Sequence, residues 1–336
     1  MRFGAVPLAQ AEGAVLAHSL DLGGRKLRKG RVLNAEDVAA MAAIGRAEVI
    51  VAQLDPGDLD EDAAAALIAG SMVPDPDAAR LRLTEASTGR VNVYATVPGV
   101  LVLDVDKIEA ANRVDPLITI ATSMPFARTR GRMMVATVKI IAYGIAAAAA
   151  EAAARAVRDA MRVRPVELKT ATLIQTDIGA GPGKGEAAIR GRLEALGMDL
   201  IAAPVVPHRT GPLAAALAAA EGDLVLILTA SATSDPADVG PEAVRSAGGT
   251  VTRFGMPVDP GNLLFLGEQG GRPVIGLPGC ARSPALNGAD WVLERVACGL
   301  QVDDGDIAAM GVGGLLKESP ARPHPRERRK AMLPRT

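Results

Sequence analysis

Residues that could bind an oxygen-rich ligand gather in four segments of the second half of the chain. The first segment, residues 176–185, is rich in glycine and lies between a predicted strand and a predicted helix. Such a loop leaves backbone N–H groups free, and the start of a helix favours an anion. It is not a Walker A loop, because Ile178 stands where a glycine is needed and Gly185 where a Ser or Thr is needed. The segment is either a flexible strand–helix connection or a phosphate contact through Thr176, Asp177, Gly181 and Lys184.

The second segment, residues 228–238, ends the predicted central strand of a sheet. Open α/β sheets bind ligands at the carboxyl ends of their strands, where Thr229 and Ser231 would let a ligand approach the backbone. Asp235 and Asp238 are candidate catalytic residues and Mg²⁺ ligands, because Mg²⁺ is commonly held by one or two carboxylates together with substrate phosphates. Alternatively, Asp238 or Ser234 caps the helix that follows.

The third segment, residues 255–264, contains two prolines and two glycines that predict a rigid turn. Rigid turns position side chains, and an Asn amide can recognise the edge of a heterocycle through its donor and its acceptor. The candidate binding residues of this turn are Pro260, Gly261 and Asn262.

The fourth segment, residues 276–284, precedes a helix for which we expect Ser283 as the N-cap and Pro284 at the first position. Arg282 beside a helix N-terminus would attract an anion by charge as well as by dipole. Cys280 is also a candidate nucleophile, since a helix N-terminus favours the thiolate, but no histidine is near it in the sequence. The candidate binding residues here are Pro278, Gly279, Cys280, Arg282 and Ser283.

The elements that position these segments alternate between strand and helix from residue 167 onward. This rhythm predicts an α/β fold, a three-layer α/β/α domain over residues 166–302 with a mostly parallel sheet. The expected strands cover residues 171–175, 200–206, 223–229, 250–254 and 273–276, and the expected helices cover 186–196, 212–220, 241–247 and 283–297.

A smaller α+β, β-rich region precedes that domain. Residues 1–85 predict an α+β segment, in which Asn34 and Asp37 form a capping box for a helix over 35–43 that Gly45 ends. A strand over 48–53 and a helix over 61–69 complete it. Residues 86–165 predict a β-rich unit and an Ala-rich connecting helix, and residues 303–336 a C-terminal extension and linker, expected to be disordered from residue 320. The expected elements of the β-rich unit are strands over 91–95, 100–105, 118–122 and 133–141 and the helix over 146–161.

Composition excludes several classes of protein. The 37 basic and 38 acidic side chains nearly cancel, so no global charge attracts nucleic acid or anionic lipid. Two cysteines are too few for a disulfide framework, and three distant histidines are expected to be structural or surface-exposed. The longest apolar stretch, residues 140–150, is shorter than the roughly 20 residues that span a bilayer. We therefore expect a cytoplasmic protein that binds neither nucleic acid nor membrane.

The last three segments together resemble the molybdopterin-binding domain shared by molybdopterin molybdenumtransferases and molybdopterin adenylyltransferases. In that family a Thr-Ser-Gly-Gly loop and an Asp end a strand, a Met-x-Pro-Gly-Lys-Pro turn follows, and Leu-Pro-Gly-Asn-Pro precedes a helix. The counterparts here are residues 229–235, 256–262 and 277–281. Three family positions differ: the paired glycines are Ser231 and Ala232, the turn lysine is Asn262, and the last Asn is Cys280.

The chain is most similar to a bacterial subgroup of molybdopterin-binding proteins. That subgroup carries Leu-Thr-Ala-Ser-Ala, Gly-Met-Pro-Val-Asp-Pro-Gly-Asn-Leu-Leu and Pro-Gly-Cys-Ala-Arg-Ser-Pro, all present here. Its members are often fused to a molybdenum cofactor cytidylyltransferase-like domain, and the Pro- and Arg-rich tail from Pro320 resembles the start of such a linker. Residues 13–20 and 30–51 also resemble the transferases.

The resemblance implies molybdopterin or adenylylated molybdopterin as the ligand, a possible Mg²⁺, a homodimer, and a molybdenum cofactor nucleotidyltransferase as a possible partner. Two functions stay open: a module that binds and presents the pterin in molybdenum cofactor biosynthesis, and a Mg²⁺-dependent molybdenumtransferase or adenylyltransferase. In the enzyme, the glycine-rich and Arg282 loops would hold phosphate, Asp235 or Asp238 the Mg²⁺, and Asn262 with Ser231 the pterin. The lost turn lysine and paired glycines favour the binding module.

Overall fold

The chain forms two compact units, Met1–Pro165 and Val166–Thr336. The computed structural model describes residues 1–179, 181, 183 and 185–316, so the candidate Lys184 and the expected linker beyond residue 316 lie outside the described residues. Within those ranges, every helix falls short of the length and apolar character needed to cross a membrane.

The first 53 residues fold around a core of their own, which includes Leu16, Met41 and Val51. The predicted capping box is confirmed: the Asn34 side chain accepts the N–H of Asp37, whose carboxylate accepts the N–H of Asn34. This part contains β1 (Arg2–Pro7), the 3-10 turn η1 (Leu8–Gln10), β2 (Val15–Leu16), β3 (Leu20–Asp21), β4 (Lys26–Leu27), α1 (Ala35–Ala43) and β5 (Glu48–Gln53).

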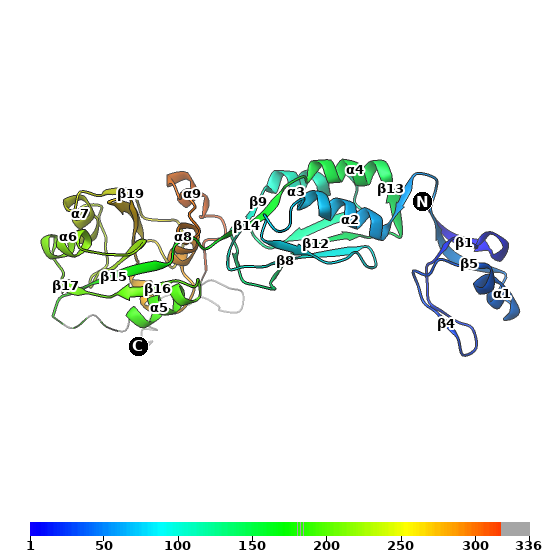
Figure 1. The fold of residues 1–336 in the computed structure, drawn as a ribbon, viewed down its shortest axis with the longest axis horizontal. Helices are drawn as coiled ribbons and strands as arrows, with labels where there is room; N and C mark the ends of the chain where they lie inside the picture. Colours follow the sequence, from blue (N-terminus) through cyan, green and yellow to red (C-terminus); the bar gives the residue numbers. More distant parts are fainter. Residues whose placement is uncertain (180, 182, 184, 317–336) are drawn as a thin grey trace, which may run out of the picture. The chain divides into compact units, whose positions relative to one another are not determined.

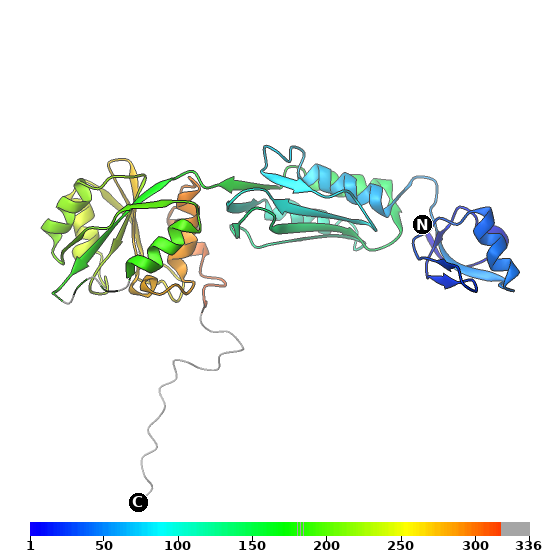
Figure 2. The ribbon, with the colours of Figure 1, turned by 60° about the horizontal axis from the view of Figure 1, so that its bottom comes forward.

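The rest of the first unit packs helices on one face of an antiparallel sheet with strand order β10-β12-β8-β7 (Figures 1 and 2). Helix α2, grouped with the leading segment on sequence, contributes Ile68 and Met72 to this core. The helix expected over 146–161 is shorter, since Asp159 adopts a left-handed φ of 53° and Met161 begins a strand. The elements are β6 (Asp58–Asp60), α2 (Glu61–Met72), β7 (Leu81–Leu83), β8 (Arg90–Ala95), β9 (Gly99–Leu103), α3 (Val105–Asn112), β10 (Ile118–Thr122), β11 (Arg128–Thr129), β12 (Met134–Ile140), β13 (Gly144–Ala146), α4 (Ala147–Ala156) and β14 (Met161–Pro165).

The second unit is a mixed α/β fold on a seven-stranded, mostly parallel sheet, with order β16-β15-β18-β21-β20-β19 and β17 beside β15. Strands β20 and β19 run antiparallel at one side. The strand expected over 200–206 is interrupted: β16 and β17 pair with different halves of β15, and Pro204 between them has no N–H to donate. The elements are β15 (Thr170–Asp177), α5 (Gly185–Glu194), β16 (Asp199–Ala202), β17 (Val205–Pro207), α6 (Thr210–Ala218), β18 (Leu224–Leu228), α7 (Val239–Ser246), β19 (Thr250–Phe254), β20 (Phe265–Gln269), β21 (Arg272–Gly276), the 3-10 turn η2 (Gly279–Arg282), α8 (Gly288–Ala297) and α9 (Asp304–Ala309).

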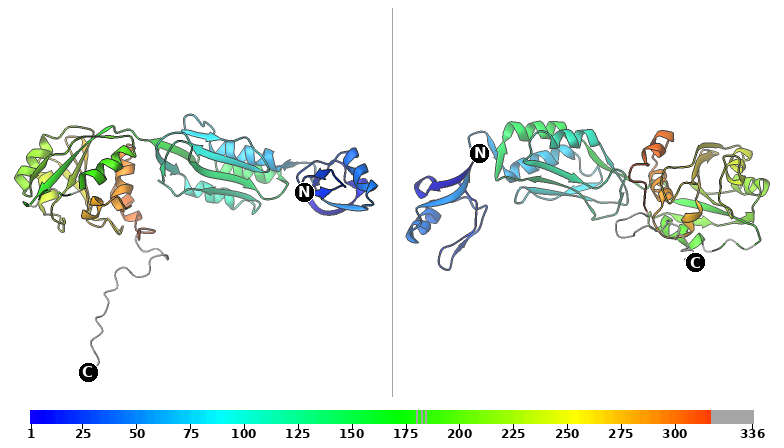
Figure 3. Two further views of the ribbon diagram at one scale, coloured as in Figure 1. Left: turned by 90° about the horizontal axis from the view of Figure 1, so that it is seen from below. Right: turned by 180° about the vertical axis from the view of Figure 1, so that it is seen from behind.

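Helices pack on both faces of this sheet. Alternate residues of β18 belong to two different apolar clusters, with Leu226 on the side of α5 and α8 and Ile227 on the side of α6 and α7. Figure 3 shows the green α5 and orange α8 apart from the yellow-green α6 and α7 across the strands. Because β18 is buried along its whole length, the aliphatic run that predicted it is typical of a strand covered on both faces.

Candidate functional site

The strand register brings the four candidate segments to one edge of the second unit's sheet. Gln175 pairs with Leu228 and Ile227 with Gly276, so β15, β18 and β21 end side by side. Strand β20 begins at the same edge, where Phe265 pairs with Gly276. The loops after β15, β18 and β21 and the turn before β20 therefore lie at the same end of the sheet, where the parallel strands end. We call this end of the sheet the carboxyl edge.

Thr176, near the end of β15, contacts two of the connections at this edge. Its buried hydroxyl oxygen accepts the Ala230 N–H at 2.7 Å and lies 2.9 Å from Nδ1 of His208. The hydroxyl can donate to Nδ1 of a neutral imidazole, whose proton then lies on Nε2. The loop after β18 and the segment before α6 are thus fixed to the end of β15, and Asp177 accepts the backbone N–H of His208 through its carbonyl.

Arg282 connects the loop after β21 to the glycine-rich segment. Its Nη2 donates to the Thr229 carbonyl at 2.8 Å. A Cβ placed on Gly185, the first residue of α5, would lie 3.2 Å from Nη1 of Arg282 and 2.5 Å from a methyl of Leu228. The close approach explains why glycine suits position 185, and it puts a guanidinium beside the N-terminus of a helix, where an anion is favoured. Gly181 is exposed in the same loop.

The helix start expected at Ser283 and Pro284 is wrong. Helix α8 begins at Gly288, and its N-cap is Asn287, which forms a capping box with Asp290. Ser283 is exposed, and its hydroxyl accepts the N–H of Ala285. Arg282 therefore lies at the start of α5 rather than of α8, and Pro278, Gly279 and Cys280 belong to a short 3-10 turn and its flank.

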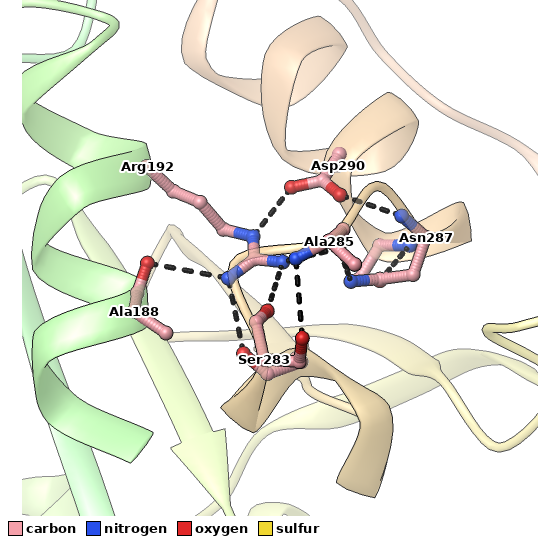
Figure 4. A network of polar contacts seen from close by, with 8 residues as sticks. Ala188, Arg192, Ser283, Ala285, Asn287 and Asp290 are labelled. Carbon is pink, nitrogen blue, oxygen red and sulfur yellow. Dashed lines mark hydrogen bonds and ion pairs between the residues drawn. The ribbon is translucent and has the colours of Figure 1, made fainter. Parts of the chain in front are cut away.

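Arg192 joins α5 to the segment between η2 and α8 (Figure 4). Its Nε lies 2.5 Å from the Asp290 carboxylate, and the two side chains are 10% and 11% exposed. The two Nη atoms donate to main-chain carbonyls of α5 and of the segment before α8: Ala188, Ala281, Ser283 and Ala285. These contacts fix the segment before α8 to α5, and α8 begins at the capping box of Asn287 and Asp290.

The turn before β20 packs against the N-terminus of α8. The Gly288 N–H donates to the Pro260 carbonyl at 2.8 Å, and a Cβ on Gly261 would meet the Gly288 nitrogen at 2.8 Å. Pro260 and Gly261 are buried in this contact, whereas Asn262 is exposed and donates its amide to the Met256 carbonyl at 3.3 Å. Of the three candidates in this turn, Asn262 is the one open to solvent.

Asp235 and Asp238 both make local hydrogen bonds. Asp238 is the N-cap of α7, with one oxygen accepting the N–H of Val239 and the other that of Ser234. Asp235 accepts the N–H of Ala237. No cluster of three or more His, Cys, Asp or Glu suited to a metal occurs in the described part of the chain. A Mg²⁺ at these aspartates would compete with the backbone N–H groups and would need further oxygens from its ligand.

Sequence reasoning did not predict two contacts beside the carboxyl edge. His208, expected to be structural or surface-exposed, contacts Thr176, which lies 32 positions away. Arg192 lies in the last turn of α5, 98 positions before its partner Asp290. The Asn287–Asp290 spacing was a visible capping-box signal. A cavity of about 480 Å³ borders the edge at Gly183 and continues along the outer side of α5 to Glu194.

Comparisons with known proteins return weak similarities. One family matches, a domain of unknown function (DUF8806), over residues 5–53. No curated protein matches the chain. Among solved structures, it is similar to the molybdopterin biosynthesis MoeA protein of Pyrococcus horikosii, with 15% identity, TM-score 0.31, and 89% of this chain and 76% of that one covered.

Two shorter structures match part of the chain. The molybdopterin biosynthesis enzyme MoaB of Thermus theromophilus has 21% identity and TM-score 0.27, with 40% of this chain and 98% of that one covered. The CinA protein with unknown function of Thermoplasma acidophilum has 18% identity and TM-score 0.29, with 39% and 98% covered.

Proposed function

We propose that the second unit is a three-layer α/β/α domain that binds molybdopterin, or its nucleotide form, at the carboxyl edge in molybdenum cofactor biosynthesis. The observation that carries the proposal is the reach of Arg282 across that edge. Its guanidinium contacts the Thr229 carbonyl and lies at the first turn of α5. Three loops that resemble molybdopterin-binding segments, or that are rich in glycine, thereby surround one cation.

The chemistry of this arrangement suits a phosphorylated heterocycle. Arg282 and the start of α5 would receive the phosphate, since an Arg guanidinium and helical N–H groups favour the same anion. The exposed Ser231 and Asn262 would supply hydrogen bonds to the pterin ring, while the buried Thr229 hydroxyl donates to the Ser231 carbonyl and holds the loop. Arg192 and Thr176 would act indirectly by holding the loops in place.

The side chains at the carboxyl edge suit a protein that binds and presents the pterin better than they suit an enzyme. The turn that carries a lysine in the transferases carries the neutral Asn262, so one counter-charge to phosphate or molybdate is missing. Both oxygens of Asp238 accept backbone N–H groups, as expected for a helix cap. We infer that the ligand is held and passed on, and that a molybdenum cofactor nucleotidyltransferase is the class of partner that would receive it.

The test is to incubate the purified full chain with molybdopterin, ATP, Mg²⁺ and molybdate. Two quantities are measured: the pterin that the protein retains, and the turnover of the added molybdopterin to product. We expect retention without turnover. Turnover would establish the transferase alternative, and failure to retain any form of the pterin would contradict both functions.

A pair of variants ties retention to the carboxyl edge. Arg282→Gln should weaken retention by about tenfold or more, the loss of one charge-assisted contact. Arg272→Gln makes the same change of charge at the opposite end of β21, where Arg272 bonds the Ala220 carbonyl, and should leave retention unchanged. We also propose a homodimer, for which light scattering at micromolar concentration should give twice the mass of one chain.

A further inference from the structure

The sheet of the first unit has one face that helices cover and one that they leave uncovered. Ile118, Val93 and Val138 point into the core beneath α2 and α4. Strand alternation puts the intervening residues of β7, β8 and β12 on the other face. These are polar or cationic for the most part: Arg82, Arg90, Asn92, Tyr94, Thr137 and Lys139.

The strands of this face are set in a part of the sequence that lacks acidic residues. Residues 86–103 and 116–150 contain no Asp or Glu, although the whole chain is almost neutral. Lys139 pairs with Glu61 of α2, but the arginines of these strands and turns give a local excess of positive charge that the net charge of the chain conceals. The acidic residues nearest to β7 in the sequence are Asp75, Asp77 and Glu85.

Four arginines gather where β8 ends, and we call them the arginine cluster: Arg80, Arg82, Arg130 and Arg132. The Thr96 N–H donates to the Arg80 carbonyl, and the Arg132 N–H donates to the Ala95 carbonyl. Arg130 belongs to the same tight turn as Arg132, and Arg82 lies over the ring of Tyr94 at 4.7 Å. All four arginines are exposed, and within the described residues none of them pairs with a carboxylate.

Two members of the cluster have a backbone conformation that arginine seldom adopts. Arg80 has a φ of 56° and Arg132 a φ of 66°, in the left-handed region that Gly and Asn occupy at lower cost. Gly131 directly precedes Arg132, yet the left-handed residue of the turn is the arginine. Neither backbone conformation favours arginine, and both side chains are exposed to solvent.

We propose that the arginine cluster is a docking site for an acidic polypeptide segment of a partner protein. Arginine forks match carboxylates in a bidentate manner, and four of them on a rigid sheet end would hold a run of Asp or Glu. Single-stranded nucleic acid fits less well, because it needs aromatic rings for its bases. Tyr94 is the aromatic residue of this face, and the Arg82 guanidinium already covers its ring.

The test measures binding of a decaglutamate peptide to the full chain at low and high salt, with a dT₁₀ oligonucleotide for comparison. Decaglutamate should bind at low salt, and more tightly than dT₁₀, with affinity that falls as salt rises. The double variant Arg80→Asn/Arg132→Asn should weaken this binding by about tenfold or more, as loss of two exposed charge pairs. Its thermal midpoint should stay unchanged or rise, because Asn relieves the left-handed backbone.

The matched control is Arg155→Gln/Arg158→Gln, which removes the same charge from exposed residues at the end of α4 in the same unit. The control should bind decaglutamate like the wild type. A second variant, Arg82→Gln/Arg130→Gln, changes residues with ordinary backbone and should reproduce the loss. Equal loss in the control, absence of binding at low salt, tighter binding of dT₁₀, or a lowered midpoint in the Asn variant would each overturn the proposal.

Discussion

Replacing Arg192 by Met should destabilise the second unit far more than the same change two residues away. Arg192 makes an ion pair with Asp290 and donates to four carbonyls, and both charged side chains are about nine-tenths buried. Removing one partner of a buried pair leaves a charge without compensation and costs about 3–5 kcal/mol. Arg190 pairs with Glu186 on the exposed side of α5, so Arg190→Met should cost at most about 1 kcal/mol.

The assay is urea unfolding followed by tryptophan emission. Trp291 is the chain's single tryptophan and follows Asp290 in α8, so its emission reports the unit that contains the network. The double variant Arg192→Met/Asp290→Asn should cost at least about 1 kcal/mol less than the sum of the single variants, since the two side chains interact directly. The reasoning fails if Arg192→Met and Arg190→Met shift the midpoint equally.

Three further outcomes follow from individual contacts. Thr176→Val removes a buried acceptor of a backbone N–H and should cost about 1–3 kcal/mol in the same assay, and a loss within error would contradict its role in tying the edge together. Gly276→Ala would put a Cβ 1.9 Å from the Phe265 ring and should destabilise the second unit by about 1–3 kcal/mol. Gly191→Ala, in open space on a helix, should instead stabilise it by up to about 1 kcal/mol. The opposite order of stability would contradict the close packing of Gly276 against Phe265. Backbone N–H groups at the start of β15 lower the pKa of the Asp223 carboxyl. The stabilisation that the Asp223 carboxylate provides is therefore present above the ordinary Asp range and is lost as pH falls through the lowered pKa. The difference in urea midpoint between the wild type and Asp223→Asn should shrink between about pH 7 and about pH 3, and a constant difference would refute this.

Local signals in the sequence predicted the elements whose ends are set by their own side chains. Asn34 and Asp37 satisfy each other's backbone, so the start of α1 needs no information from elsewhere in the chain. The aliphatic run of β18 likewise identified a strand inside the sheet, since burial on both faces removes the usual alternation. Strand order brings Arg282 and Thr229 together at the carboxyl edge.

The sequence-based predictions were wrong or absent where a segment contacts a side chain far away in the sequence. Ser283 and Pro284 form a good helix start by themselves, but Arg192 bonds the Ser283 carbonyl, and α8 begins at the capping box of Asn287. The pairing of His208 with Thr176 depends on β17 lying beside the end of β15, which spacing alone does not reveal. Residues that position a loop from another element leave no local pattern.

Hydrogen exchange on the full chain, with and without added molybdopterin, tests most directly whether the carboxyl edge is the ligand site. Added pterin should slow exchange at backbone amides in residues 229–234 and 278–283 and leave the first unit unaffected. Slower exchange confined to residues 1–165, or to the start of the strands at the other end of the sheet, would contradict the account.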